Sequence, residues 1–171
     1  MNSKVRKVII NGSSNANGET EKAVSQLILI SKCDVINLKE YNITHFDYEH
    51  KNREDDFIEL MKRIENGYDV LIFATPVYWY SMSGIMKVFF DRFSDLLSIE
   101  KAVGRKLSGK YMAAISSSNG DNLGDDFWLP FRKTATYLGM KYISDLHVIQ
   151  GELDPVQMSD FMLKIDETAS L

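Results

Sequence analysis

The chain has 171 residues, 44% of them hydrophobic and 26% charged, and its formal net charge at pH 7 is −4. This length and composition predict one globular domain over residues 1–171 with a substantial buried core. A nucleic-acid surface needs clustered Lys and Arg side chains, and the sequence contains no such cluster. We therefore exclude nucleic acid as a partner.

The single cysteine and the short apolar segments limit the cofactors and the compartment. Cys33 alone can form neither an intramolecular disulfide nor a cysteine-ligated cluster. The apolar segment after Lys7 is shorter than the core of a signal peptide, and no segment approaches the roughly 20 apolar residues of a membrane span. We expect a cytoplasmic protein without a membrane partner.

Short apolar runs alternate with longer stretches of helical spacing along the chain. The runs predict strands at residues 8–10, 35–38, 70–74, 112–115 and 143–149. The stretches predict helices around residues 23–30, 57–64, 85–93, 131–138 and 156–168. Continuously apolar strands are typical of a parallel sheet that is covered on both faces. The alternation predicts an α/β fold, a flavodoxin-like three-layer sandwich with a five-stranded parallel sheet of order 2-1-3-4-5.

Polar segments outside these elements are expected to have structural roles. Residues 41–55 form the least regular segment, so we expect a mobile excursion there, and residues 49–56 form a solvated charge run. Asp91 and Arg92 in the third helix are typical of a structural ion pair or an interface. We expect no metal site, because the spacing of metal ligands is missing around the three histidines, His45, His50 and His147.

Ligands of an open parallel sheet bind beyond the carboxyl ends of its strands, near the point where the strand order reverses. The candidates are therefore the loops after the first, third and fourth strands. The first loop, residues 11–20, is rich in turn residues and short hydroxyl side chains. Free N–H groups at the start of the following helix could bind a phosphate. The alternative is a plain turn in which Asn17 or Thr20 caps the helix.

The second loop, residues 75–84, contains three consecutive aromatic residues directly after a buried strand: Tyr78, Trp79 and Tyr80. A core role is difficult to assign, because the chain has already left the sheet. A flat conjugated ring bound there would shield these side chains from water. A subunit interface is the alternative, and both hold if the ligand lies between subunits. The third loop, residues 116–122, is small and polar and could present N–H and hydroxyl groups to the same ring.

These loops resemble the NADPH-dependent FMN reductase family, especially its multimeric-flavodoxin branch. The resemblance extends over roughly residues 8–149. It is strongest in the second loop and the helix after it, in Thr75-Pro76-Val77-Tyr78-Trp79, Ser81-Met82-Ser83-Gly84 and Lys87 with Asp91-Arg92. The first loop follows the phosphate loop of the family at Gly12, Ser13, Gly18 and Thr20. It departs from that pattern at Asn15, where a basic residue is common, and at Glu19, where Asn is usual.

The resemblance implies an enzyme that binds FMN non-covalently and takes electrons from NADPH or NADH. Around the phosphate it places Ser13, Asn15, Asn17, Gly18, Glu19 and Thr20. Along the isoalloxazine it places Pro76, Val77, Tyr78 and Trp79, and at one edge of the ring Ser117, Ser118, Asn119 and Gly120. No acid–base catalyst is expected, because the cofactor carries the hydride chemistry. The acceptor would be a quinone, a flavin, a nitro or azo compound or a metal ion.

Two other functions are compatible with the sequence. One is a flavodoxin-type electron carrier without nicotinamide activity, and the other is a cofactor-free interaction module, which Asn15 and Glu19 keep open. In each case we expect a homodimer or a higher homo-oligomer. The expectation comes from apolar residues in excess around the third helix, namely Tyr80, Met82, Ile85, Met86 and Phe90.

Overall fold

A parallel sheet forms the centre of the protein, as shown by a computed structural model that describes residues 5–170. Its strands lie in the order β2-β1-β3-β5-β6. Their bounds are β1 Lys7–Asn11, β2 Asp34–Asn37, β3 Val70–Tyr78, β5 Tyr111–Ser118 and β6 Lys141–Ile149. The predicted order of the five parallel strands is confirmed. A two-stranded hairpin extension, in which β4 (Ser81–Met82) pairs antiparallel with the end of β3, was not predicted.

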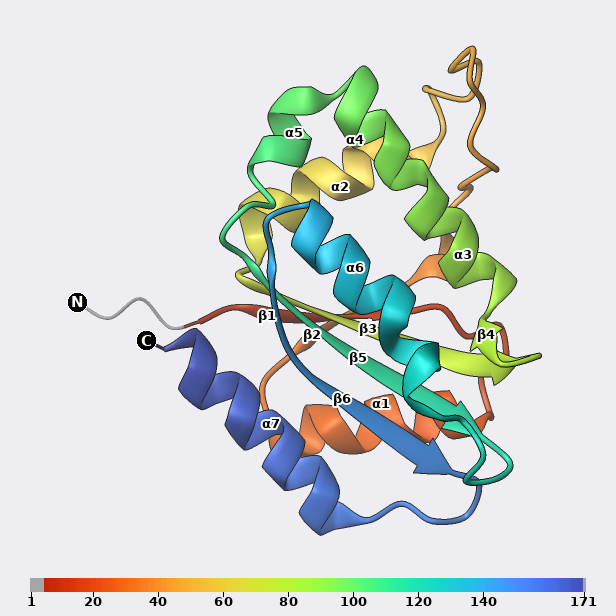
Figure 1. The fold of residues 1–171 in the computed structure, drawn as a ribbon, viewed down its shortest axis with the longest axis vertical. Helices are drawn as coiled ribbons and strands as arrows, with labels where there is room; N and C mark the ends of the chain where they lie inside the picture. Colours follow the sequence, from red (N-terminus) through yellow and green to blue (C-terminus); the bar gives the residue numbers. More distant parts are fainter. Residues whose placement is uncertain (1–4, 171) are drawn as a thin grey trace.

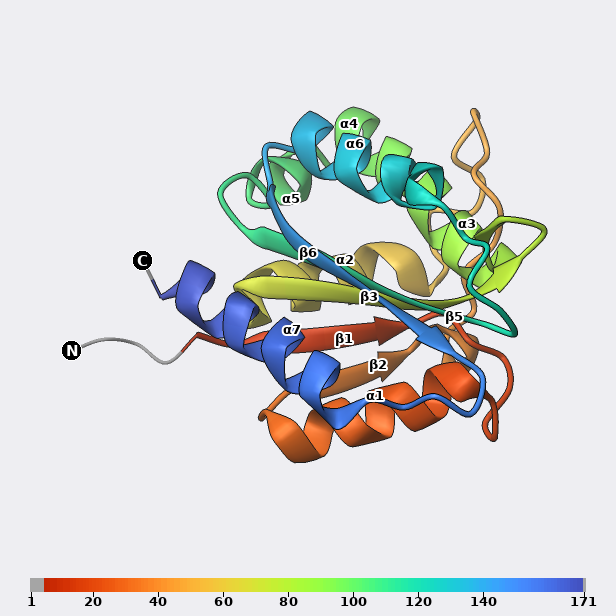
Figure 2. The same cartoon turned by 60° about the horizontal axis from the view of Figure 1, so that its bottom comes forward.

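Helices cover both faces of the sheet (Figures 1 and 2). One face is covered by α1 (Glu19–Ile30) and α7 (Pro155–Ala169). The other is covered by α2 (Asp56–Gly67), α3 (Gly84–Asp91) and α6 (Leu129–Tyr137). Two short helices that the periodicity did not indicate, α4 (Asp95–Ser98) and α5 (Lys101–Arg105), connect α3 to β5. The three-layer flavodoxin-like sandwich is therefore confirmed.

The central strands are apolar on both faces because both faces are buried. Val8, Ile9 and Ile10 of β1 are fully buried, and so are Ile72 and Phe73 of β3. Phe73 belongs to a cluster of aromatic rings between the sheet and α3, in which neighbouring ring centroids lie 5.0 to 6.4 Å apart. This packing fixes α3 against the sheet and thereby fixes the loop that precedes it.

Three of the residues expected to provide an oligomer surface lie in this core instead. Met82, Met86 and Phe90 are buried within the single chain, with exposures of 6%, 0% and 9%. The helical spacing of these side chains is therefore explained by packing against the sheet. Tyr80 is exposed and Ile85 is partly exposed, so only these two of the five residues lie where a second copy could contact them.

Residues 41–55, all of which the structure describes, form neither helix nor strand, yet they are anchored at a buried arginine. The Arg92 guanidinium is fully buried and donates to the Asp55 carboxylate, the Asp95 carboxylate and the Thr44 carbonyl. The Asp55 side chain is only 5% exposed, so the expectation of a solvated charge run is wrong at this residue. Arg92 forms a structural ion pair, as predicted, whereas Asp91 pairs separately with Lys87 at the surface.

Among the described residues, no helix combines the length and the apolar character that crossing a membrane requires. Within the same residues, no group of three or more His, Cys, Asp or Glu side chains is arranged to hold a metal ion.

Candidate functional site

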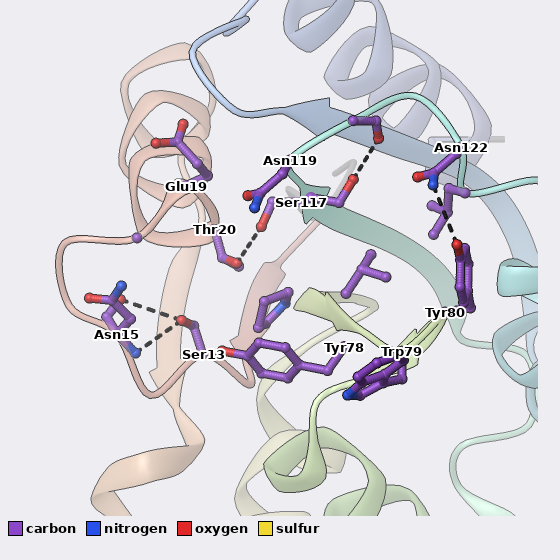
Figure 3. Close-up of a pocket in the computed structure, with 16 residues that line it drawn as sticks. Ser13, Asn15, Glu19, Thr20, Tyr78, Trp79, Tyr80, Ser117, Asn119 and Asn122 are labelled. Atoms are coloured by element: carbon purple, nitrogen blue, oxygen red, sulfur yellow. Dashed lines mark hydrogen bonds between the residues drawn. The ribbon is translucent and has the colours of Figure 1, made fainter.

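The three predicted loops meet in one cavity of about 680 Å³ beyond the carboxyl ends of β1, β3 and β5 (Figure 3). Every residue predicted for the site lines it except Asn17. The cavity is lined by Ser13, Asn15, Gly18, Glu19, Thr20, Pro76, Val77, Tyr78, Trp79, Tyr80, Ser117, Ser118, Asn119, Gly120, Asn122 and Leu123. Its volume is typical of a small-molecule or cofactor site.

Buried polar contacts shape the first loop. The Asn11 side chain is fully buried, and its oxygen accepts a hydrogen bond from the Ser13 N–H at 3.0 Å. The Ser13 hydroxyl in turn accepts from the Asn15 N–H at 3.2 Å. Gly12 packs so closely on α3 that an added Cβ would lie 2.9 Å from the Met86 Cβ, which explains the glycine. The loop is thus fixed around its lining residues.

The start of α1 faces this loop with free backbone donors. Gly18 is the N-cap, and within residues 5–170 no side chain caps this helix. By contrast, α2, α3 and α7 are each capped by a side-chain oxygen, from Asp55, Ser83 and Asp154. The alternative in which Asn17 or Thr20 caps α1 is therefore not observed. The uncapped N–H groups and the positive end of the helix dipole favour an anion at this position.

Glu19 lies in the first turn of α1, but its carboxylate is already engaged. One oxygen accepts from the Lys22 ammonium at 2.7 Å and the other from the Gly151 N–H at 3.4 Å. These hydrogen bonds, Lys22 first, lower the pKa of Glu19 below its usual value, so the side chain is ionised at neutral pH. Lys22 places a positive charge beside the carboxylate that Glu19 brings to the rim of the cavity.

The second loop is an antiparallel hairpin, because β3 runs on to Tyr78 instead of ending near Ala74. Tyr78 pairs with Ser81, which leaves Trp79 and Tyr80 as a two-residue turn. The base of the hairpin is tied to the sheet, since the buried Thr75 hydroxyl accepts from the Ser83 N–H at 2.9 Å. The Ser83 hydroxyl donates to the Gly12 carbonyl at 2.7 Å and so connects the second loop to the first.

The tip of this hairpin is strained and exposed. Trp79 and Tyr80 both have positive φ, 50° and 60°, in a turn that ordinarily requires Asn-Gly or a similar pair. Bulky side chains in this conformation are uncommon and cost on the order of 1–3 kcal/mol each. Trp79 is nevertheless 95% exposed and Tyr78 54% exposed. Neither packing within the chain nor turn propensity explains the presence of these aromatic residues at the tip.

The third loop is joined to the first by a buried hydrogen bond. The hydroxyls of Thr20 and Ser117 lie 2.7 Å apart, and the two residues are only 1% and 4% exposed (Figure 3). At the other end of the cavity, the Asn122 amide donates weakly to the Tyr80 hydroxyl over 3.5 Å. The three loops therefore form one connected rim and not three independent turns.

Three residues that line the cavity were not among the residues predicted to bind the cofactor: Tyr80, Asn122 and Leu123. Tyr80 belongs to the aromatic run and Asn122 to the polar third loop, so both could have been predicted by including every residue of those two segments. Leu123 carried no signal, because one apolar residue in a loop is common. The buried polar residues that shape the loops, Asn11 and Thr75, were also missed.

Comparison with known proteins identifies the family. The sequence profile of NADPH-dependent FMN reductases matches residues 5–152. The chain belongs to the NADPH-dependent FMN reductase family. YwqN of Bacillus subtilis (strain 168), named as an NAD(P)H-dependent FMN-containing oxidoreductase, is 26% identical over 144 residues, which cover 78% of this chain and 79% of YwqN. The resemblance inferred from the sequence is thus confirmed, as is its assignment to FMN-dependent oxidoreductases that use NAD(P)H.

Solved structures confirm the fold over nearly the whole chain. The Trp repressor binding protein of B. subtilis superposes with a TM-score of 0.65 at 23% identity, covering 96% of both chains. The FMN-dependent NADH-azoreductase of Bacillus anthracis, solved in complex with FMN, superposes with a TM-score of 0.61 at 14% identity, covering 96% of this chain and 97% of that one. FMN is the cofactor of this family, and the cavity has the features its parts require: an uncapped helix start for a phosphate and exposed aromatic side chains for a ring.

Proposed function

We propose that this chain binds FMN non-covalently in the cavity and passes electrons from NADH or NADPH through it to a small acceptor. The observation that carries the proposal is the meeting of an uncapped helix start and a strained aromatic hairpin in one cavity. The acceptor classes that fit an open cavity of this kind are quinones, free flavins, nitro or azo compounds and metal ions.

Residues of the first loop are suited to hold the cofactor phosphate. The Ser13 and Thr20 hydroxyls and the N–H groups at the start of α1 border the same part of the cavity. Asn15 and Gly18 complete this end, and Glu19 lies there with its charge paired to Lys22. Because these groups are mostly neutral donors, we propose that the phosphate is bound by hydrogen bonds and the helix dipole more than by ion pairs.

The other two loops are suited to hold the flat ring. Pro76, Val77, Tyr78 and Trp79 form the wall on the hairpin side, and Ser117 to Gly120 form the opposite polar wall. Apolar and aromatic walls exclude water from a bound ring, while the polar loop can donate to its heteroatoms. No acid–base residue is assigned, because these side chains are needed only for binding and orientation.

An absorbance experiment tests this function. The purified protein is incubated with excess FMN, desalted, and then mixed anaerobically with NADH or NADPH. We expect retained yellow colour that bleaches with one of the nicotinamide nucleotides. Colour that both nucleotides leave unchanged would instead indicate an electron carrier, and a colourless protein would contradict FMN binding.

We also propose a homodimer whose interface includes the hairpin tip. Trp79 and Tyr80 are exposed beside the cavity, and Tyr and Trp are the residue types enriched at protein interfaces. A two-fold dimer would cover them and would place a second copy at the open side of the cavity. Sedimentation at several protein concentrations tests this, and a monomer at every concentration would rule the dimer out.

A further inference from the structure

His147, on the edge strand β6, contacts the third loop from the side that faces away from the cavity. It lies beside Ser116 in the register between β5 and β6, and it is half-buried. Its Nδ1 is 2.7 Å from the Ser116 hydroxyl, and its Nε2 is 3.0 Å from the Ser118 hydroxyl and 3.3 Å from the Gly120 carbonyl. The imidazole does not line the cavity, whereas Ser118 and Gly120 do.

Hydrogen-bond accounting assigns the tautomer of this imidazole. The Gly120 carbonyl can only accept, so Nε2 carries the proton and donates toward Gly120 and Ser118. The Ser118 hydroxyl donates to the same carbonyl at 2.8 Å. Nδ1 then accepts from the Ser116 hydroxyl, which is fully buried. With its proton on Nε2, His147 gives every polar group of the cluster a hydrogen-bond partner.

Ser117, between the two serines that His147 contacts, is held from the opposite side. Its hydroxyl bonds to Thr20 at the start of α1. The end of β5 is therefore fixed on one face of the sheet by the first loop and at the edge by His147. Removing the imidazole would remove its contacts to Ser118 and Gly120, while the Ser117–Thr20 bond and the backbone pairing of Ser118 with β6 would remain.

We infer that His147 is a positioning residue for the wall formed by residues 118–120, and that this wall determines the affinity for the flavin ring. The inference rests on the proposed function. It assigns His147 to the ring end of the cavity and not to the phosphate end, because its side chain contacts Ser118 and Gly120 of the third loop and its hydrogen bonds include no residue of the first loop.

Two amide substitutions separate the contacts of the imidazole. A Gln side chain places its terminal amide near the position of Nε2, so His147→Gln keeps a donor for Gly120 and Ser118. An Asn side chain reaches only the position of Nδ1, so His147→Asn keeps a partner for Ser116 alone. His147→Phe removes both nitrogen atoms and keeps the ring. Asp145→Asn is the matched control, because Asp145 lies on the same strand and bonds to Arg132 and Tyr142 but not to the loop.

The experiment measures the Kd of FMN and of riboflavin, together with amide hydrogen exchange of residues 118–121 in the flavin-free protein. We expect His147→Phe and His147→Asn to raise both Kd values by the same factor, about tenfold, because ring contacts are common to both ligands. We expect exchange of residues 118–121 to accelerate in these two variants. His147→Gln should restore both readouts toward the wild-type values.

A purely structural role for His147 predicts a different pattern. All three His147 variants would then lower stability as Asp145→Asn does, with both Kd values and the exchange of residues 118–121 unchanged, and this result would overturn the inference. Equal behaviour of the Gln and Asn variants would also overturn it. If the wild-type protein binds neither flavin, the proposed function fails, and the exchange rates of the flavin-free variants still decide whether His147 holds the loop.

Discussion

At the residue scale, Asn15 is the position where a single charge should change cofactor binding most directly. It lines the end of the cavity that we propose for the phosphate and is exposed, and the resemblance indicates that a basic residue is common at this point. Asn15→Arg would add a charge-assisted hydrogen bond to a phosphate, and such a bond contributes about 1.5–3 kcal/mol. We expect the Kd for FMN to fall about tenfold or more, as measured by fluorescence titration.

Asn17 provides the matched control for this substitution. It stands in the same loop two residues later, but it does not line the cavity. Asn17→Arg adds the same charge and should leave the Kd for FMN nearly unchanged. Riboflavin, which has no phosphate, should bind equally to both variants and to the wild type. Equal tightening of FMN by both substitutions would indicate a general charge effect and would contradict the assignment of Asn15 to the phosphate.

At the element scale, the β3–β4 hairpin combines strain with exposure. Replacing Trp79-Tyr80 with Asn-Gly gives the turn the residues that its positive φ angles require. We expect the flavin-free protein to become more stable by on the order of 1 kcal/mol, measured by urea unfolding. The same protein should bind FMN more weakly, because an exposed aromatic wall has been removed.

A gain in stability together with a loss of FMN affinity distinguishes a hairpin built for binding from one built for folding. Tyr137, which is 76% exposed on α6 and does not line the cavity, supplies the control. Tyr137→Asn removes an exposed aromatic ring elsewhere and should leave the Kd for FMN unchanged. A hairpin variant that loses stability would show that Trp79 and Tyr80 contribute to folding after all.

The Arg92 cluster connects α3 to residues 41–55 and should be the most sensitive polar contact in the fold. Arg92→Leu would leave the Asp55 carboxylate buried without a cation and would leave His50 as the remaining ionisable partner of Asp95. Breaking a buried pair in this way costs about 3–5 kcal/mol of the free energy of unfolding. Lys87→Met, which breaks the exposed pair with Asp91 on the same helix, should cost no more than about 0.5 kcal/mol.

Asp55 gives this cluster a defined pH dependence. Burial acts to raise the pKa of Asp55, but hydrogen bonds from Arg92, Thr44 and Phe57 outweigh it and hold the pKa below the ordinary value of 3.8. A group with a lowered folded-state pKa stabilises the protein fully above its unfolded pKa and loses this contribution as the pH falls through the folded pKa. Urea unfolding should therefore show wild-type stability falling below about pH 4, and Arg92→Leu should flatten that fall.

The same elements show what the sequence could predict. The strands were predictable because Val8 to Ile10 and Val70 to Ala74 are apolar at every position, as a sheet buried on both faces requires. The extension of β3 to Tyr78 was not, because it depends on two pairs with β4 and on the bond from Ser83 to Thr75. The burial of Arg92 was also hidden, since Asp55 lies 37 positions away in the sequence.

The location of the site was predictable because parallel strands end at one edge of a sheet, so the three polar or aromatic loops had to meet there. The contacts that hold the three loops in place could not be predicted from the sequence. The contacts of His147 depend on the register of β6 against β5, which no sequence pattern specifies. Spacing alone could not show which face of α3 packs against the sheet, because apolar residues follow helical spacing on two adjacent faces. The structure buries Met86, Phe89 and Phe90, whereas Ile85 and Val88 on the adjacent face stay partly exposed.

At the scale of the whole molecule, cofactor binding and global stability must be coupled. The three loops that line the cavity follow β1, β3 and β5, and hydrogen bonds through Ser83 and Ser117 connect them to one another. A ligand that contacts all three loops can bind only the folded chain. Its binding free energy then adds to the free energy of unfolding according to mass action.

This coupling gives a prediction that needs no assumption about the electron acceptor. FMN at 100 times its Kd should stabilise the fold by about 2.7 kcal/mol. For a domain of this size, that raises the Tm by about 5–10 °C, as measured by differential scanning calorimetry. Asn15→Arg should give a larger shift than the wild type at the same FMN concentration, whereas Asn17→Arg should match the wild type. A Tm that saturating FMN leaves unchanged would contradict a site built from all three loops, because no ligand can contact them together without favouring the folded state.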